Sequence, residues 1–162
     1  MYTQENRIEN EEGLSHPEKR NIAYIICNIL VLLLYSIYVF RKYQQGEINL
    51  AEDLSFWGLT ILIFVAISVV VRIVIEILLN IINAIVTRKE EDLSFTDERD
   101  KLIELKAIKI SEVVVGIGFL LSMISLVVKM PPFVMINVIF FSLFIGDIIG
   151  SVAQLFYYRR GF

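Results

Sequence analysis

The sequence contains a single cysteine, a single histidine and only three prolines among its 162 residues. Because Cys27 has no second cysteine to pair with, an intrachain disulfide and a cysteine-based zinc site are both excluded. His16 stands beside Pro17 in a polar N-terminal stretch, where a lone histidine is more often incidental than a ligand or a base. No proline falls in the interior of four long apolar stretches, which are therefore predicted to be unbroken helices.

Motifs for catalysis are also missing. The chain has no His-Glu-x-x-His, no Gly-x-Ser-x-Gly and no P-loop, and the serines of the apolar stretches have no histidine nearby to activate them. We therefore expect no catalytic residue, no enzymatic activity, no cofactor and no bound metal. A metal site built from Glu76, Glu112 and Asp147 is a minor alternative, which neither a histidine nor a second cysteine supports.

What the sequence has in abundance is apolar surface. Hydrophobic residues make up 56% of the chain and the mean hydropathy is +0.67, well above the range of soluble domains of this size. A membrane-spanning helix needs about 20 apolar residues. The chain is accordingly predicted to be an all-α integral membrane four-helix bundle, residues 21–162, after a polar tail, residues 1–20. The predicted spans are 21–40, 57–87, 97–129 and 132–157.

The second of these stretches carries charge deep inside its apolar run. Arg72 and Glu76 are separated by one helical turn and so share a face, which Ser68 and Asn80 extend. A charged side chain at membrane depth is costly, so this face must contact protein or water rather than lipid. The stretch would also measure roughly 46 Å as a helix, against a hydrocarbon core of about 30 Å, so its last turns are expected to project from the bilayer.

The third stretch begins with charged turns that should also stand in water. Together with the end of the second helix, they are predicted to form a cytoplasmic helical hairpin. The surface of this predicted hairpin comprises Asp97, Glu98, Arg99, Lys101 and Lys106.

Counting residues from the outer ends of the helices gives the depth of each intramembrane charge. Arg72 and Asp147 come out almost level, which predicts an ion pair between helices two and four, with Glu76 as the secondary partner of Arg72. Glu76 and Glu112 come out about one turn closer to the cytoplasm, within reach of Lys109 or Asn80. On the first helix, Tyr24 and Asn28 either reach this polar stripe or serve as an interfacial tyrosine and a packing asparagine.

Small residues mark two helix faces as packing surfaces. Gly118 lies on a small-residue face of the third span, and Gly146 and Gly150 form a small-xxx-small pattern in the fourth. Small residues allow helices to approach closely, either inside one bundle or between protomers. We expect a homo-oligomer.

The distribution of basic residues predicts the orientation. Four spans place both termini on one side, which collects eleven Lys and Arg residues, against three on the other. The positive-inside rule then puts both termini and the predicted hairpin in the cytoplasm. Segment 88–106 has five basic and seven acidic residues, so nucleic acid is not an expected partner.

Two functions fit these features. The first is a non-enzymatic interaction, assembly or regulatory module that meets a cytoplasmic protein partner through the predicted hairpin. The alternative is an ion- or proton-conducting channel or transporter that uses Arg72, Glu76, Glu112 and Asp147. The small size and the lack of any internal repeat or broken helix favour the first.

A family resemblance adds to this. The segment Asp97-Glu98-Arg99, followed by Lys106-Ala107 and by the C-terminal Tyr158-Arg159-Arg160-Gly161, resembles a group of small uncharacterised four-span membrane proteins of bacteria and archaea. The resemblance implies a four-helix architecture in a prokaryotic cytoplasmic membrane, with lipid as the surrounding partner. It carries over no activity, and the Arg72–Glu76 pair is not part of the shared pattern.

Overall fold

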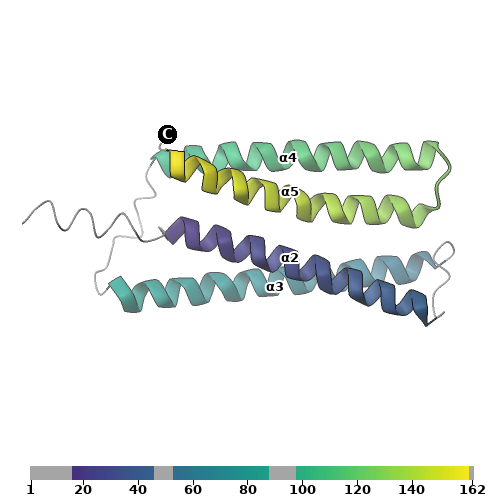
Figure 1. The fold of residues 1–162 in the computed structure, drawn as a ribbon, viewed down its shortest axis with the longest axis horizontal. Coiled ribbons are helices and arrows are strands. Elements are labelled where there is room, and N and C mark those ends of the chain that lie inside the picture. Colours follow the sequence, from purple (N-terminus) through teal and green to yellow (C-terminus); the bar gives the residue numbers. More distant parts are fainter. Residues whose placement is uncertain (1–15, 46–52, 88–97, 161–162) are drawn as a thin grey trace, which may run out of the picture.

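Four long helices make up the described part of the chain, which covers residues 16–45, 53–87 and 98–160 of this computed structural model (Figure 1). They are α2 (His16–Gln44), α3 (Leu54–Thr87), α4 (Glu98–Val127) and α5 (Pro132–Arg160). Each helix is long and apolar enough to cross a membrane. The prediction of an all-α protein with four such helices is confirmed. Residues 1–15 of the predicted tail lie outside the described part.

Local signals explain where these helices begin and end. The carboxylate of Asp53 accepts a hydrogen bond of 3.0 Å from the backbone N–H of Phe56 and so caps the start of α3. After α4, Lys129 has a positive φ of 62°, and the N–H of Met130 donates to the carbonyl of Ser125 at 2.9 Å. This is a Schellman ending. Pro132 then occupies the first position of α5, where proline is well tolerated.

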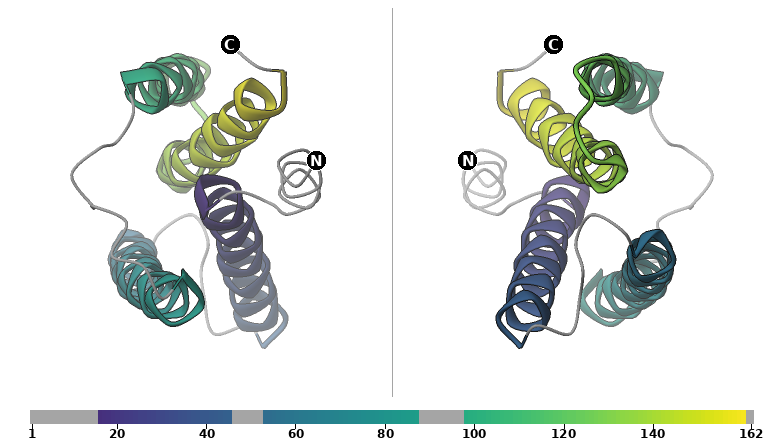
Figure 2. Two further views of the ribbon diagram at one scale, coloured as in Figure 1. Left: turned by 90° about the vertical axis from the view of Figure 1, so that its left-hand side faces the viewer. Right: turned by 90° about the vertical axis from the view of Figure 1, so that its right-hand side faces the viewer.

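The helices lie side by side in an open arc, in the order α4, α5, α2, α3. The end-on views show α3 and α4 at the two ends of this arc (Figure 2). Within the described ranges, α5 packs on α4, α2 and α3, and α2 packs on α3, whereas the backbones of α3 and α4 do not approach each other. The start of α2 and the end of α5 lie at the same end of the molecule, which we call the terminal end (Figure 1).

The predicted packed hairpin between the second and third helices is wrong. Helix α3 turns its polar side toward α2 and α5, because Glu76 bonds to Tyr24 and Arg72 pairs with Asp147. Helix α4 instead packs closely on α5. Within the described ranges, the backbones of α3 and α4 therefore have other neighbours and do not approach each other. Asp97 lies outside the described residues.

The contact between α4 and α5 is made by small residues. A Cβ at Gly118 would collide with the side chain of Ser142 on α5. A Cβ at Gly146 would lie 2.7 Å from Cγ2 of Val115, and one at Gly150 would lie 3.1 Å from Cβ of Ser111. All three glycines therefore serve close packing within one protomer.

Aromatic side chains fill the half of the molecule away from the terminal end. Tyr35 and Phe140 are each 1% exposed, and their ring centroids are 4.4 Å apart. Phe64 meets Tyr35 edge-on at 5.3 Å, and Trp57 stacks on Phe133 at 5.5 Å. We call these five residues the aromatic layer. It joins α2, α3 and α5 and fills the space between them in this half.

Candidate functional site

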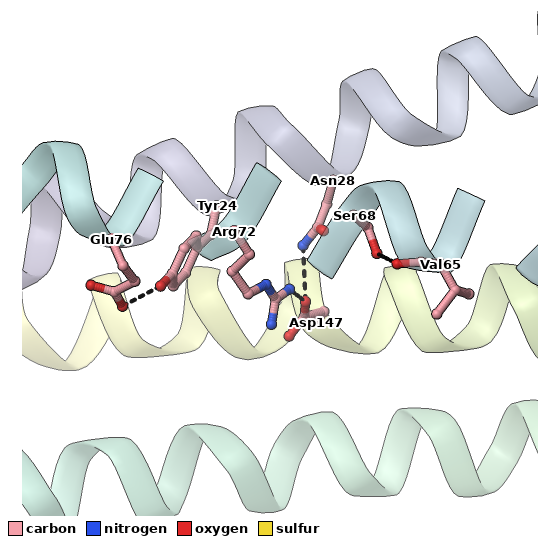
Figure 3. A network of polar contacts seen from close by, with 7 residues as sticks. All are labelled: Tyr24, Asn28, Val65, Ser68, Arg72, Glu76 and Asp147. Atoms are coloured by element: carbon pink, nitrogen blue, oxygen red, sulfur yellow. Dashed lines mark hydrogen bonds and ion pairs between the residues drawn. The ribbon is translucent and has the colours of Figure 1, made fainter. Parts of the chain in front are cut away.

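An ion pair joins Arg72, near the middle of α3, to Asp147, near the middle of α5 (Figure 3). The guanidinium of Arg72 donates to Oδ2 of Asp147. Depth counting predicts this pair, because the two residues lie at matching levels on different helices. Each charge thereby compensates the other at a level where an uncompensated charge would be costly in a bilayer.

Helix α2 adds polar groups to the same pair. Nδ2 of Asn28 donates to the same carboxylate oxygen of Asp147 at 3.1 Å. The guanidinium carbon of Arg72 lies 5.0 Å from the ring centroid of Tyr24, within cation–π range. The hydroxyl of Tyr24 in turn donates to Glu76, one turn beyond Arg72 on α3. These five residues, which we call the charge cluster, connect three helices.

Tyr24 and Asn28 are thus the residues that sequence reasoning left open. Their spacing placed them on one face of the first helix, yet the same spacing suits an interfacial tyrosine and a packing asparagine. Asn28 is only 2% exposed and donates to Asp147. This selects the interpretation in which the two residues reach the polar stripe of the second predicted span. Both residues lie in the N-terminal half of α2, and this position was the signal for their role that the sequence offered.

Glu76 and Glu112, the other two intramembrane acidic residues, do not form an ion pair with Arg72. Glu76 is 4.0 Å from the guanidinium of Arg20. Within the described ranges, Arg72 forms its ion pair with Asp147 and none with Glu76. Glu112 is exposed on α4, across the open side of the arc from Arg72, and no ion pair with Lys109 or any other described residue is recorded for it. Among the four intramembrane charges, Arg72 and Asp147 therefore form an ion pair and Glu76 lies beside them. Glu112 is separate from the other three.

Two cavities open on either side of the charge cluster. The α3-side cavity has a volume of about 570 Å³ and is walled largely by apolar residues of α3 and α5, among them Val65, Val69 and Leu143. The α4-side cavity has a volume of about 710 Å³. Both cavities are lined in part by Tyr24, Arg72, Glu76 and Asp147.

The α4-side cavity is polar and extends toward the terminal end. Its lining includes Arg20 and Asn21 at the start of α2, Glu104 near the start of α4, and Gln154 near the end of α5. In the opposite half, the aromatic layer occupies the space between α2, α3 and α5. The structure thus has one half with a polar cavity and one half that is packed with aromatic side chains.

The residues predicted for the surface of the hairpin are at the start of α4. Glu98, Arg99 and Lys101 are exposed at the terminal end. The ammonium of Lys106 lies 5.8 Å from the ring centroid of Tyr157 on α5. These side chains form part of the charged end of α4 and do not converge on a cavity with α3.

The chemistry available in the cluster is electrostatic. Within the described ranges, no three His, Cys, Asp or Glu side chains come together in a way that could hold a metal ion. The groups present donate and accept hydrogen bonds and compensate charge. The one described cysteine, Cys27, is buried among the apolar core of α2, α3 and α5.

No family model, no curated protein and no solved structure matches this chain. The four long apolar helices are those of a small multi-pass membrane protein, by their length and hydropathy. The charge cluster and the open side of the arc are therefore the features that bear on function.

Proposed function

We propose that this chain is a non-enzymatic interaction and assembly module of a membrane, and that it acts as a homo-oligomer. Its interaction surface is the open side of the arc, between α3 and α4. The observation that supports this is the exposed Glu112, in the middle of α4, facing the open side. A carboxylate at that depth must face protein or water, and a second protein molecule on the open side would cover it.

A second copy of the chain offers the complementary charge. Lys109 and Glu112 are both exposed and lie about one turn apart on α4. If two copies are related by a twofold axis along the membrane normal, Lys109 of one copy can reach Glu112 of the other. Each interface then contains two such pairs, and a cyclic dimer of this kind is the commonest oligomer.

Cysteine crosslinking in membranes tests this arrangement. Residue 108 lines the α4-side cavity. In a Cys27→Ser background, the Ile108→Cys variant should therefore form a disulfide between two copies under oxidation. Ile117→Cys is the matched control, because residue 117 is exposed on the opposite face of the same helix and does not line the α4-side cavity. Equal crosslinking at both positions, or at neither, would contradict the proposed interface.

A charge exchange provides an independent check. Glu112→Lys or Lys109→Glu alone should reduce the crosslinking of Ile108→Cys, since each places like charges across the interface. The two changes combined should restore it. Loss without recovery would mean that this charge pairing does not hold the copies together.

The orientation belongs to the same proposal. We place both termini and the start of α4 in the cytoplasm, in a prokaryotic cytoplasmic membrane, on the basis of the eleven-to-three distribution of basic residues. A cytoplasmic protein partner would then contact Glu98, Arg99 and Lys101 at the start of α4. It would not contact a packed hairpin of α3 and α4. Reporter fusions after Phe162 and at Gly46 should report opposite sides of the membrane, and agreement between them would contradict this topology.

The second candidate is conduction of protons or ions. It is favoured by the polar α4-side cavity, which extends from the terminal end to Arg72 and Asp147. The aromatic layer counts against a continuous path through the other half. We therefore prefer the interaction module.

A further inference from the structure

Two buried donor groups at the mouth of the α4-side cavity have no acceptor among the described residues. They are Nε of Arg20 and Nδ2 of Asn21. The Asn21 side chain is only 2% exposed, and it lines the cavity beside Arg20. A buried donor without an acceptor is unfavourable, so these two groups favour a ligand that brings acceptor oxygens.

The mouth lies at the level where lipid headgroups are found. Arg20 is in the second turn of α2, Glu104 is in the second turn of α4, and Gln154 is in the second-last turn of α5. At 1.5 Å per residue, all three lie within about 10 Å of a helix end. Since the helices are longer than the hydrocarbon core of about 30 Å, this level is close to the membrane interface.

The same mouth also contains an uncompensated negative charge. Glu104 lines the cavity and is exposed, and no ion pair between it and another described residue is recorded. A simple anion that bound Arg20 and Asn21 would face this carboxylate. A zwitterion with a phosphate and an ammonium group satisfies both sides of the mouth at once.

We infer that the mouth of the α4-side cavity binds the phosphoethanolamine headgroup of a membrane lipid. The phosphate oxygens accept from Arg20 and Asn21, and the primary ammonium donates to Glu104. A trimethylammonium group lacks N–H donors and fits this site less well. This site goes beyond the proposed function. Its mouth, at Arg20, Asn21 and Glu104, is nearer the terminal end than Glu112, where the copies are proposed to meet.

The shape of the open side favours a lipid over a soluble phosphoethanolamine compound. Both cavities share lining residues of the charge cluster, so they adjoin. The apolar wall of the α3-side cavity, formed by residues such as Val65, Val69 and Leu143, offers a surface for an acyl chain. A headgroup held at the mouth can thus extend an acyl chain toward this wall, which leaves Glu112 on α4 to the second copy.

Thermal unfolding of the full chain in detergent, with added lipid, tests the inference. Phosphatidylethanolamine should raise the unfolding midpoint more than phosphatidylcholine or phosphatidylglycerol with the same acyl chains. Asn21→Leu and Glu104→Gln should each weaken the apparent affinity for phosphatidylethanolamine by roughly tenfold, as expected for the loss of one hydrogen bond to a charged group. Glu98→Gln, at an exposed position of α4 that lines neither cavity, is the matched control for Glu104→Gln and should bind as the wild type does.

Three results would overturn the inference. Equal shifts by all three lipids would show that the headgroup is not recognised. A preference for phosphatidylglycerol that survives Glu104→Gln would indicate an anion site. Competition by soluble glycerophosphoethanolamine at the same concentration as the lipid would identify a soluble ligand. If Asn21→Leu does not fold, Glu104→Gln alone decides, because that side chain is exposed and its substitution leaves packing intact.

Discussion

Arg72 and Asp147 compensate each other's charge in a single contact between α3 and α5. The free energy of folding should therefore depend on this contact. Asp147→Asn should lower the thermal stability in detergent, because it leaves the guanidinium of Arg72 without a counter-charge. In soluble interiors such a loss costs about 3–5 kcal/mol. We expect less here, since the two side chains are 42% and 39% exposed and a bilayer can admit water to a charge.

Adding Arg72→Gln to Asp147→Asn should recover part of the lost stability, since it removes the unpaired charge. A double-mutant cycle on unfolding midpoints measures this coupling. Independent effects at positions 72 and 147 would show that Glu76 or water compensates Arg72 instead.

Lys129 is the second residue with a specific local cost. It has a positive φ of 62° at the C-terminal end of α4, a position that glycine usually occupies. Lys129→Gly should raise stability by about 1 kcal/mol, because glycine adopts this conformation without strain. Lys129→Ala removes the same charge but keeps the strain, so it should give no gain. If both variants gain equally, the charge rather than the backbone is responsible.

At the scale of the elements, the contact between α4 and α5 depends on the absence of side chains. Gly118→Ala should destabilise the protein by roughly 1–3 kcal/mol, because the added methyl group would overlap Ser142 and force the helices apart. Gly116→Ala is the matched control on the same helix, where a Cβ meets nothing within 4 Å. It should be neutral or stabilise by up to about 1 kcal/mol through helix propensity. Equal effects in denaturation experiments would contradict the close contact seen here.

Each helix and the level of each charge along it could be predicted from the sequence alone. Hydropathy and length define a membrane helix, and depth follows from counting residues, which is why Arg72 could be matched to Asp147. Lateral order could not be predicted in this way, because apolar helix faces look alike in a sequence. The chain could equally have packed α3 on α4, and the predicted hairpin failed for this reason. Asn28 was ambiguous for a related reason, since an asparagine in a span serves packing or a polar cluster equally well.

At the scale of the whole molecule, the arc is asymmetric along its length as well as around its circumference. Toward the terminal end, Arg20, Glu104 and Gln154 line an open polar cavity. Toward the other end, Tyr35 and Phe140 are buried in the aromatic layer, and the hydroxyl of Tyr35 is engaged by Asn137 at 2.5 Å. A binding surface needs only one open half. A conducting path needs polar groups in both halves.

This asymmetry predicts the outcome of a flux experiment. Wild-type protein in proteoliposomes should show no proton or ion flux above that of empty vesicles, because aromatic side chains fill the space between α2, α3 and α5. Glu76→Gln and Asp147→Asn should leave that baseline unchanged. If instead the wild type conducts and these two variants abolish the flux while remaining folded, the charge cluster is a transport site. The open side of the arc would then be an entrance rather than a contact surface between copies, because ions reaching Asp147 must pass through the α4-side cavity that a second copy would cover.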